Sequence, residues 1–311
     1  MATTKPPSSP KKQYGIVVML DALGVSHYTL KQCEVFLKKQ NEMMNEIIKT
    51  KKDFKNYDFL KGIITATFGD TIIICYPIKE NDSYSSLEIL GWVGLHLSYL
   101  LNLGIKTGIL FRGSISIGDF LYGDNVVLGP AVFDAHDWYE SADWFGVILS
   151  PKIQLWLESA LETEKRKESH DAIRLFEYGI VQYDVPLTHR EKEKEKKFWV
   201  IAWPAHYYDE GIKTPAGPLG NLSNNLYKIP ISKLGEPKFK NSIDFFKWYG
   251  TDVYQKNGRD KLNLMFLWKE WPPILLINKD KRRRPRRDAP AAVSVTKNIE
   301  TNLPRRASES P

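Results

Sequence analysis

Cysteine is scarce in this chain, which has only Cys33 and Cys75 among its 311 residues. Both lie within apolar sequence patterns, which is typical of buried thiols in a reducing compartment. We therefore expect two free thiols rather than a disulfide, and a cytoplasmic location.

Long apolar runs are missing as well. No stretch of roughly eighteen apolar residues occurs, so the sequence predicts no transmembrane segment. The first residues, 1–13, contain Lys, Pro and Ser but not the apolar run of a signal peptide, and we expect them to form a disordered leader.

The net charge of +7 belongs to the tails of the chain. Residues 279–311 hold ten Lys/Arg and four Asp/Glu, and residues 1–12 hold three Lys and no acid, which leaves −2 for residues 13–278. A near-neutral folded part does not indicate a specific nucleic-acid surface. The run Lys281–Arg287 has no interleaved aromatic residues, so it favours a solvated tail with nonspecific affinity for nucleic acid or anionic membrane.

An acidic residue follows the first strongly apolar run of the sequence. The run Ile16–Leu20 predicts a buried strand that ends at Asp21, and Gly24 and Ser26 follow before a predicted helix. A carboxylate at a strand end, next to free backbone amides at a helix start, is a recurrent way to hold a cation beside phosphate.

A second acidic residue lies within Thr67–Tyr76. Two apolar runs flank Gly69 and Asp70 there, which predicts a tight hairpin with Asp70 at its tip. Taken alone, Gly-Asp favours an ordinary hairpin turn. If this hairpin pairs with the strand that ends at Asp21, the two carboxylates lie side by side and form a two-metal site.

Four sequence motifs, in order and in register, resemble those of class III nucleotidyl cyclases. They are Asp21-Ala-Leu-Gly24-Val-Ser26, Phe68-Gly69-Asp70, Arg112-Gly-Ser-Ile115-Ser-Ile-Gly118 and Gly129-Pro-Ala-Val132-Phe-Asp-Ala135. The resemblance extends over residues 14–203. It implies an α/β (α+β) fold, with a ferredoxin-like cyclase sheet and helices on one face.

The resemblance also implies the parts of an active site. Two divalent cations, Mn²⁺ or Mg²⁺, would bind at Asp21, Ala22 and Asp70, and both aspartates would be catalytic together with Arg112. The implied substrate-binding positions are Gly24, Val25 and Ser26 for phosphate and Tyr57 for the base.

Three positions depart from the purine cyclases of this family. Phe133 and Asp137 stand where those enzymes carry an Asn and an Arg that support the transition state, and Ala66 stands where a Lys reads adenine. The chain thus resembles the pyrimidine cyclases of the Pycsar anti-phage systems, in which a Tyr such as Tyr57 goes with a smaller base pocket. Its product would be cyclic UMP or cyclic CMP, and the sequence leaves the choice between UTP and CTP open.

Two other functions remain open. One is a purine cyclase with unusual base contacts. Ala66 argues against it, because a Lys at this position reads adenine in the purine cyclases. The other is a degenerate cyclase domain that only binds a nucleotide or a partner protein. Retention of Asp21 and Asp70 argues against the second, because a binding module does not need metal carboxylates.

The predicted organisation has four parts. The leader 1–13 precedes a catalytic domain, 14–203, in which the resemblance implies a symmetric homodimer with composite active sites. A Pro- and Gly-containing appendage, 204–278, packs on that domain, and a basic disordered tail, 279–311, follows. We expect a pyrimidine nucleoside triphosphate as substrate, a separate effector protein for the product, and no specific nucleic-acid partner.

Two helices carry further predictions. In Thr29–Thr50 an apolar stripe is expected to face the sheet, and Thr29 with Gln32 is expected to form a capping box. In Pro130–Trp144, His136 and Glu140 share one face from which Asp137 is turned away, which favours a surface salt-bridge face over a metal site. The stripe is formed by Leu30, Cys33, Leu37, Met44 and Ile48.

Overall fold

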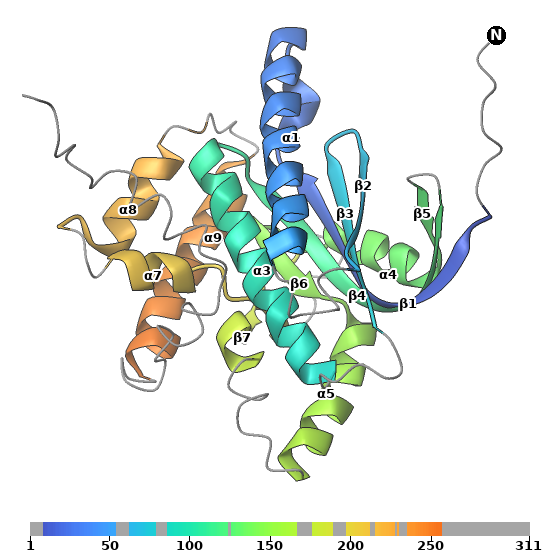
Figure 1. The fold of residues 1–311 in the computed structure, drawn as a ribbon. Helices are drawn as coiled ribbons and strands as arrows, with labels where there is room; N and C mark the ends of the chain where they lie inside the picture. Colours follow the sequence, from blue (N-terminus) through green and yellow to red (C-terminus); the bar gives the residue numbers. More distant parts are fainter. Residues whose placement is uncertain are drawn as a thin grey trace, which may run out of the picture. The chain divides into compact units, whose positions relative to one another are not determined.

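An eight-stranded sheet organises the computed structural model of the protein (Figure 1). The strands are β1 (Lys11–Ala22), β2 (Ile64–Phe68), β3 (Thr71–Pro77), β4 (Phe111–Gly123), β5 (Val126–Leu128), β6 (Gly146–Leu149), β7 (Ile180–Asp184) and β8 (Lys197–Ile201). Their order is β2-β3-β1-β4-β6-β8-β7, and β5 pairs with β4. The first strand begins at Lys11, within the range predicted as a leader.

The helices are α1 (Leu30–Asp53), α3 (Ser86–Thr107), α4 (Pro130–Tyr139), α5 (Pro151–Arg166), α7 (Ala205–Gly211), α8 (Gly217–Leu226) and α9 (Glu236–Trp248). A short 3₁₀-helix, η1 (Val25–His27), and a π-helix, η2 (Tyr249–Gln255), complete the elements. The structure describes residues 9–53, 62–78, 86–123, 126–166, 176–188, 197–211, 215–227, 229 and 235–256. The chain divides into the units 1–270 and 271–311, and all described residues belong to the first.

The predicted fold class is confirmed. The strands β2, β3, β1 and β4 are neighbours in that order and all antiparallel, and α1 and α3 connect them as in a ferredoxin-like βαββαβ unit. The strand β6 then pairs with β4 in parallel, which makes the sheet mixed. Because β1 lies between β3 and β4 and is covered on both sides, its residues 16–20 are all buried, which explains their unbroken apolar run.

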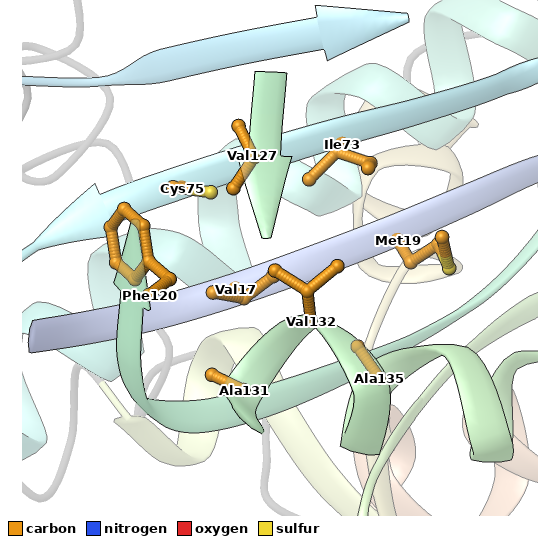
Figure 2. Close-up of a cluster of buried hydrophobic side chains, with 9 residues drawn as sticks. All are labelled: Val17, Met19, Ile73, Cys75, Phe120, Val127, Ala131, Val132 and Ala135. Atoms are coloured by element: carbon orange, nitrogen blue, oxygen red, sulfur yellow. The ribbon is translucent and has the colours of Figure 1, made fainter. Parts of the chain in front are cut away.

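Helices cover both faces of the sheet, which corrects the prediction of helices on one face. Figure 2 shows the contact of α4 with one face, where small and branched side chains of the helix meet β1 and β3. The cluster consists of Val17, Met19, Ile73, Cys75, Phe120, Val127, Ala131, Val132 and Ala135. On the opposite face, Tyr76 of β3 bonds to His96 of α3. The buried Cys75 and the half-buried Cys33 are both free thiols, as predicted.

The helix α1 presents a different face to the sheet from the predicted one. Leu30, Leu37 and Ile48 of the predicted stripe are exposed, and Cys33 and Met44 are only half-buried. The buried positions are Phe36, Gln40, Met43 and Ile47, which lie about a quarter turn around the helix. The predicted capping box at its start is present, because the Thr29 amide donates to Gln32 Oε1 at 2.8 Å and the Gln32 amide donates to Thr29 Oγ1 at 3.4 Å.

One helix, Leu87–Thr107, is long and apolar enough to cross a membrane by length and composition alone. In the structure, 83% of its most apolar window is buried inside the protein. Such burial is the behaviour of a core helix, and it explains why α3 is apolar on nearly every side.

The described part of the appendage packs on the sheet through aromatic side chains. The fully buried Phe245 of α9 lies 4.9 Å from Trp144 and 4.7 Å from Tyr183 between ring centroids. Trp203, which follows β8, contacts Phe246 at 5.8 Å between ring centroids. The helix α9 therefore shares the hydrophobic core of the sheet.

We expect Phe245→Ala to lower the free energy of unfolding by about 3–5 kcal/mol, because it removes a fully buried ring from a close-packed cluster. Denaturant unfolding followed by tryptophan fluorescence measures the change. The control is Leu155→Ala on α5, which alters a side chain that is 70% exposed and should change the free energy little. A loss below 1 kcal/mol in Phe245→Ala, a bound taken well under the usual cavity cost, would contradict this packing.

The buried pair of His96 and Tyr76 makes the free energy of unfolding depend on pH. The Tyr76 hydroxyl and His96 Nδ1 lie 2.7 Å apart, and burial lowers the pKa of His96 from 6.5 to about 4. Because the unfolded chain binds this proton more readily, the stabilisation is complete above pH 6.5 and is lost as the pH falls toward 4.

We expect wild type to lose about 3 kcal/mol more stability than His96→Gln between pH 7 and pH 4, since the variant has no proton to bind there. Denaturant midpoints at both pH values measure this difference. Equal losses in the two proteins would contradict the assignment.

Candidate active site

The carboxylate of Asp21 lies at the end of β1, between two neighbouring strands. The sheet register places Asp21 opposite Thr71 of β3 on one side and opposite Arg112 of β4 on the other. Its side chain is only 13% exposed. Close approach of β4 depends on Gly113, where a Cβ would lie 2.3 Å from the carbonyl oxygen of Met19.

The β2–β3 turn brings Asp70 to the same edge of the sheet. Gly69 adopts a φ of 60° there, and its carbonyl accepts a 3.1 Å hydrogen bond from the side chain of the buried Gln40 on α1. The amide of Ala22 donates to the carbonyl of Asp70 at 3.2 Å. The end of β1 and the hairpin tip are thus joined directly, as the sequence predicted they would be if the strands paired.

Arg112 contacts Asp21 through two nitrogens. Its Nε and Nη2 donate to Asp21 Oδ2 at 3.2 and 3.1 Å, and Nη2 also donates to Glu140 Oε1 at 2.6 Å. The guanidinium lies 5.4 Å from the ring centre of Tyr139, which is a cation–π distance. The other oxygen of Asp21, Oδ1, accepts a 3.3 Å hydrogen bond from Thr71 Oγ1.

The electrostatics of Asp21 are set by opposing effects. Burial raises the pKa of the Asp21 carboxyl above its usual range, the Arg112 guanidinium works against that shift, and the negative charge of Asp70 adds to it. The negative charge of Asp70 therefore acts on Asp21 across the pocket that both residues line.

A pocket of about 500 Å³ opens beside the two aspartates. Its lining includes Asp21 and Asp70, and on α4 it includes His136 and Tyr139. The remaining wall is mostly apolar or small and comes from β1, β2, β3, β5 and the hairpin turn. It consists of Met19, Ala66, Thr67, Phe68, Gly69, Thr71, Ile73, Val126 and Val127.

The other residues that the sequence analysis singled out fall into three groups. Gly24, Val25 and Ser26 follow β1 directly, with Gly24 at a φ of 85°, but they do not line the pocket. Tyr57 lies outside the described residues. The side chains of Phe133 and Asp137 on α4 are exposed and are not part of the pocket wall.

The donor atoms at this edge suit a hard divalent cation. Carboxylate and carbonyl oxygens are the ligands that Mg²⁺ and Mn²⁺ prefer, and Asp21 and Asp70 supply two carboxylates. Ala22 offers only backbone atoms. Within the described residues no group of three or more His, Cys, Asp or Glu is placed to hold a metal ion, so the two carboxylates would bind a cation only weakly on their own. The site therefore fits cations that also bind phosphate oxygens.

Several site residues were missed by sequence reasoning. Gln40, Thr71 and Tyr139 carried no motif signal, although Thr71 directly follows the predicted hairpin tip. Glu140 and His136 were predicted to form a surface salt-bridge face. Glu140 is 60% exposed on its side chain but pairs with Arg112 of the sheet, and His136 lines the pocket.

Comparison with solved structures finds cyclases of low identity. A rhodopsin-guanylyl cyclase catalytic core with converted specificity, in complex with ATPalphaS, is 15% identical, covering 63% of this chain and 99% of that chain (TM-score 0.36). The adenylyl cyclase CyaB from P. aeruginosa is 11% identical, covering 63% and 96% (TM-score 0.35). The guanylyl cyclase Cya2 is 12% identical, covering 63% and 94% (TM-score 0.36). No protein-family model matches the sequence, and no curated protein matches it. The fold class rests on the strand order described above.

Proposed function

We propose that this chain is a nucleotidyl cyclase that converts UTP or CTP to the 3′,5′-cyclic nucleotide and pyrophosphate. One observation carries the proposal: Asp21 and Asp70, from separate stretches of sequence, line one pocket, and Arg112 from a third stretch bonds to Asp21. Two carboxylates and a guanidinium are the groups that a triphosphate with its cations requires.

The reaction is an intramolecular phosphoryl transfer. The ribose 3′-oxygen forms a bond to the α-phosphorus, the bond from that phosphorus to the bridging oxygen of the β-phosphate breaks, and the 3′-hydroxyl proton goes to solvent. Divalent cations bound at the site would lower the pKa of the 3′-hydroxyl and neutralise the leaving pyrophosphate.

The residues of the chain have distinct roles in this proposal. Asp21 and Asp70 hold the cations, and the planar fork of Arg112 binds phosphate oxygens as negative charge develops on them. The amides of Gly24, Val25 and Ser26 have no backbone acceptor among the described residues, so they remain available to phosphate.

The pocket wall favours a pyrimidine. Ala66 offers only a methyl group at the position where the resemblance places an adenine-reading Lys, and it lies on the wall of the pocket. Phe133 and Asp137 are exposed and are not part of the pocket wall, and neither carries the amide or the guanidinium of the pair that supports the transition state in purine cyclases. Arg112 is then the side chain that offsets charge at the phosphorus.

The base specificity can be tested directly. The purified protein is incubated with each nucleoside triphosphate and Mn²⁺, and the products are identified by mass. We expect cyclic UMP or cyclic CMP. Cyclic AMP or cyclic GMP would show that Ala66 does not exclude purines, and failure to bind or convert any triphosphate would favour a partner-binding domain.

A homodimer with composite sites belongs to the same proposal. Two apolar side chains at the pocket, Phe68 and Val126, are 84% and 60% exposed in the single chain, as expected where a second chain completes the wall. Light scattering of the purified protein measures its mass, and we expect the mass of two chains.

The proposed cellular role is anti-phage signalling through a separate effector protein in the cytoplasm. It predicts that the concentration of the cyclic nucleotide rises in infected cells.

A further inference from the structure

Both oxygens of the Asp21 carboxylate already have partners within the chain. Thr71 occupies Oδ1, and Arg112 occupies Oδ2 through two nitrogens at 3.1 and 3.2 Å. The side chains of Asp21 and Arg112 are 13% and 15% exposed, so water screens this ion pair only weakly. A carboxylate in this state is not free to bind a cation.

We propose that Arg112 is a resident counter-ion that must leave Asp21 before a divalent cation binds there, and that Glu140 is the positioning residue that retains the displaced guanidinium at the pocket. The proposal rests on the proposed function, because it concerns the same carboxylates. It explains how one arginine serves as a competitor in the empty site and as a phosphate ligand in the loaded one.

The surroundings of Arg112 provide the second position. Glu140 Oε1 lies 2.6 Å from Nη2, the nitrogen that also bonds Asp21, so a small rotation transfers the guanidinium fully to Glu140. Tyr139 lies under the guanidinium at 5.4 Å from its ring centre and keeps that contact available during the rotation. Glu140 is mostly exposed, whereas Asp21 is not, so Glu140 offers the guanidinium a position nearer to solvent.

The charges at the site agree with this exchange. Arg112 pairs with two carboxylates, those of Asp21 and Glu140, and Asp70 lines the pocket beside Asp21, so three carboxylates and one guanidinium leave two net negative charges when all are ionised. A dication neutralises this excess. The guanidinium can stay nearby only if it keeps a carboxylate of its own, and Glu140 supplies it.

Mn²⁺ binding without nucleotide, measured by the electron paramagnetic resonance signal of free Mn²⁺, tests the exchange. We expect Arg112→Met, which keeps the stem of the side chain, to bind Mn²⁺ about tenfold more tightly than wild type, because the competitor is gone. We expect Glu140→Gln to bind it about threefold more weakly, because Arg112 then has only Asp21 as a partner.

A double substitution separates the positioning role from simple charge. If Glu140 acts through Arg112, Glu140→Gln changes Mn²⁺ affinity in wild type but not in the Arg112→Met background. The matched control is Asp137→Asn, which removes the same charge three residues earlier in the chain at a side chain that is 76% exposed, and it should leave affinity unchanged. Glu140→Asp should restore part of the affinity, because it keeps the carboxylate.

Two results would overturn the inference. One is an Arg112→Met protein that is folded by circular dichroism and binds Mn²⁺ no more tightly than wild type. The other is that Glu140→Gln changes Mn²⁺ affinity equally in wild type and in the Arg112→Met background. Glu140 would then act on the cation through its own charge and not through Arg112. Failure of the proposed function is distinguishable, because Mn²⁺ binding would then be unaffected by Asp70→Asn.

Discussion

Asp70→Asn is expected to lower cyclic-nucleotide production by at least about 10³-fold, because a bound cation contributes several kcal/mol to such a transfer and each 1.36 kcal/mol is a factor of ten. Asp21 alone is a poor ligand for two dications, and its Oδ2 is shared with Arg112. The loss should appear in the rate of turnover at saturating nucleotide. Product quantified by mass over time measures it.

The fold should tolerate Asp70→Asn. The hairpin depends on the Asp70 carbonyl, which accepts from the Ala22 amide, and asparagine keeps that group. The matched control is Asp119→Asn on β4, where the same charge is removed from an acid that pairs with Lys12 away from the pocket. Full activity in the control and in Asp70→Asn alike would contradict the assignment of Asp70.

Arg112→Ala is expected to lower cyclic-nucleotide production by about 10²–10³-fold while leaving the oligomeric state unchanged. Among the described residues the guanidinium is the cation that pairs with Asp21, and removal of a preorganised charge partner of the transition state costs about 10²–10³-fold in turnover. The sheet should persist in this variant, because the backbone pairing of Arg112 with Asp21 of β1 and Gly146 of β6 does not depend on its side chain.

Arg112→Lys separates charge from geometry in this prediction. Lysine keeps the positive charge but not the planar fork, so we expect partial activity, above that of Arg112→Ala and below wild type. If Arg112→Ala is as active as wild type, Arg112 is not a catalytic residue. A changed oligomeric mass in that variant would show that its loss of product has a structural origin.

Turnover and cation affinity should respond to Arg112 in opposite directions. Removal of the guanidinium frees Asp21 for Mn²⁺ but takes away a phosphate ligand, so tighter cation binding accompanies slower catalysis. Loss of folding would lower both quantities together. The two measurements on one protein therefore distinguish a site residue from a structural one.

The core of the site was predictable because its signals are local. A strand that is buried on both faces reads as an unbroken apolar run, so the end of β1 at Asp21 was visible in the sequence. The Gly-Asp turn of the hairpin was also visible. Their proximity required only that β1 and β3 pair, and the register Asp21↔Thr71 confirms that pairing.

The remaining features depend on long-range packing. The predicted stripe of α1 is apolar, but Gln40 takes a buried position instead, because its side chain bonds the carbonyl of Gly69 across the structure. Glu140 reaches Arg112 only because α4 lies on the face opposite α3, and no periodicity within α4 reports which face it covers. The position of Tyr57 remains a prediction, since it lies outside the described residues.

The most direct test of the central claim is the stoichiometry of the reaction. Purified protein is incubated with each of the four nucleoside triphosphates and Mn²⁺, and the cyclic nucleotide and pyrophosphate are quantified together. We predict equimolar amounts of a cyclic pyrimidine nucleotide and pyrophosphate from wild type and neither from Asp70→Asn. Release of pyrophosphate without a cyclic product, or equal product from Asp70→Asn, would contradict a two-carboxylate cyclase site.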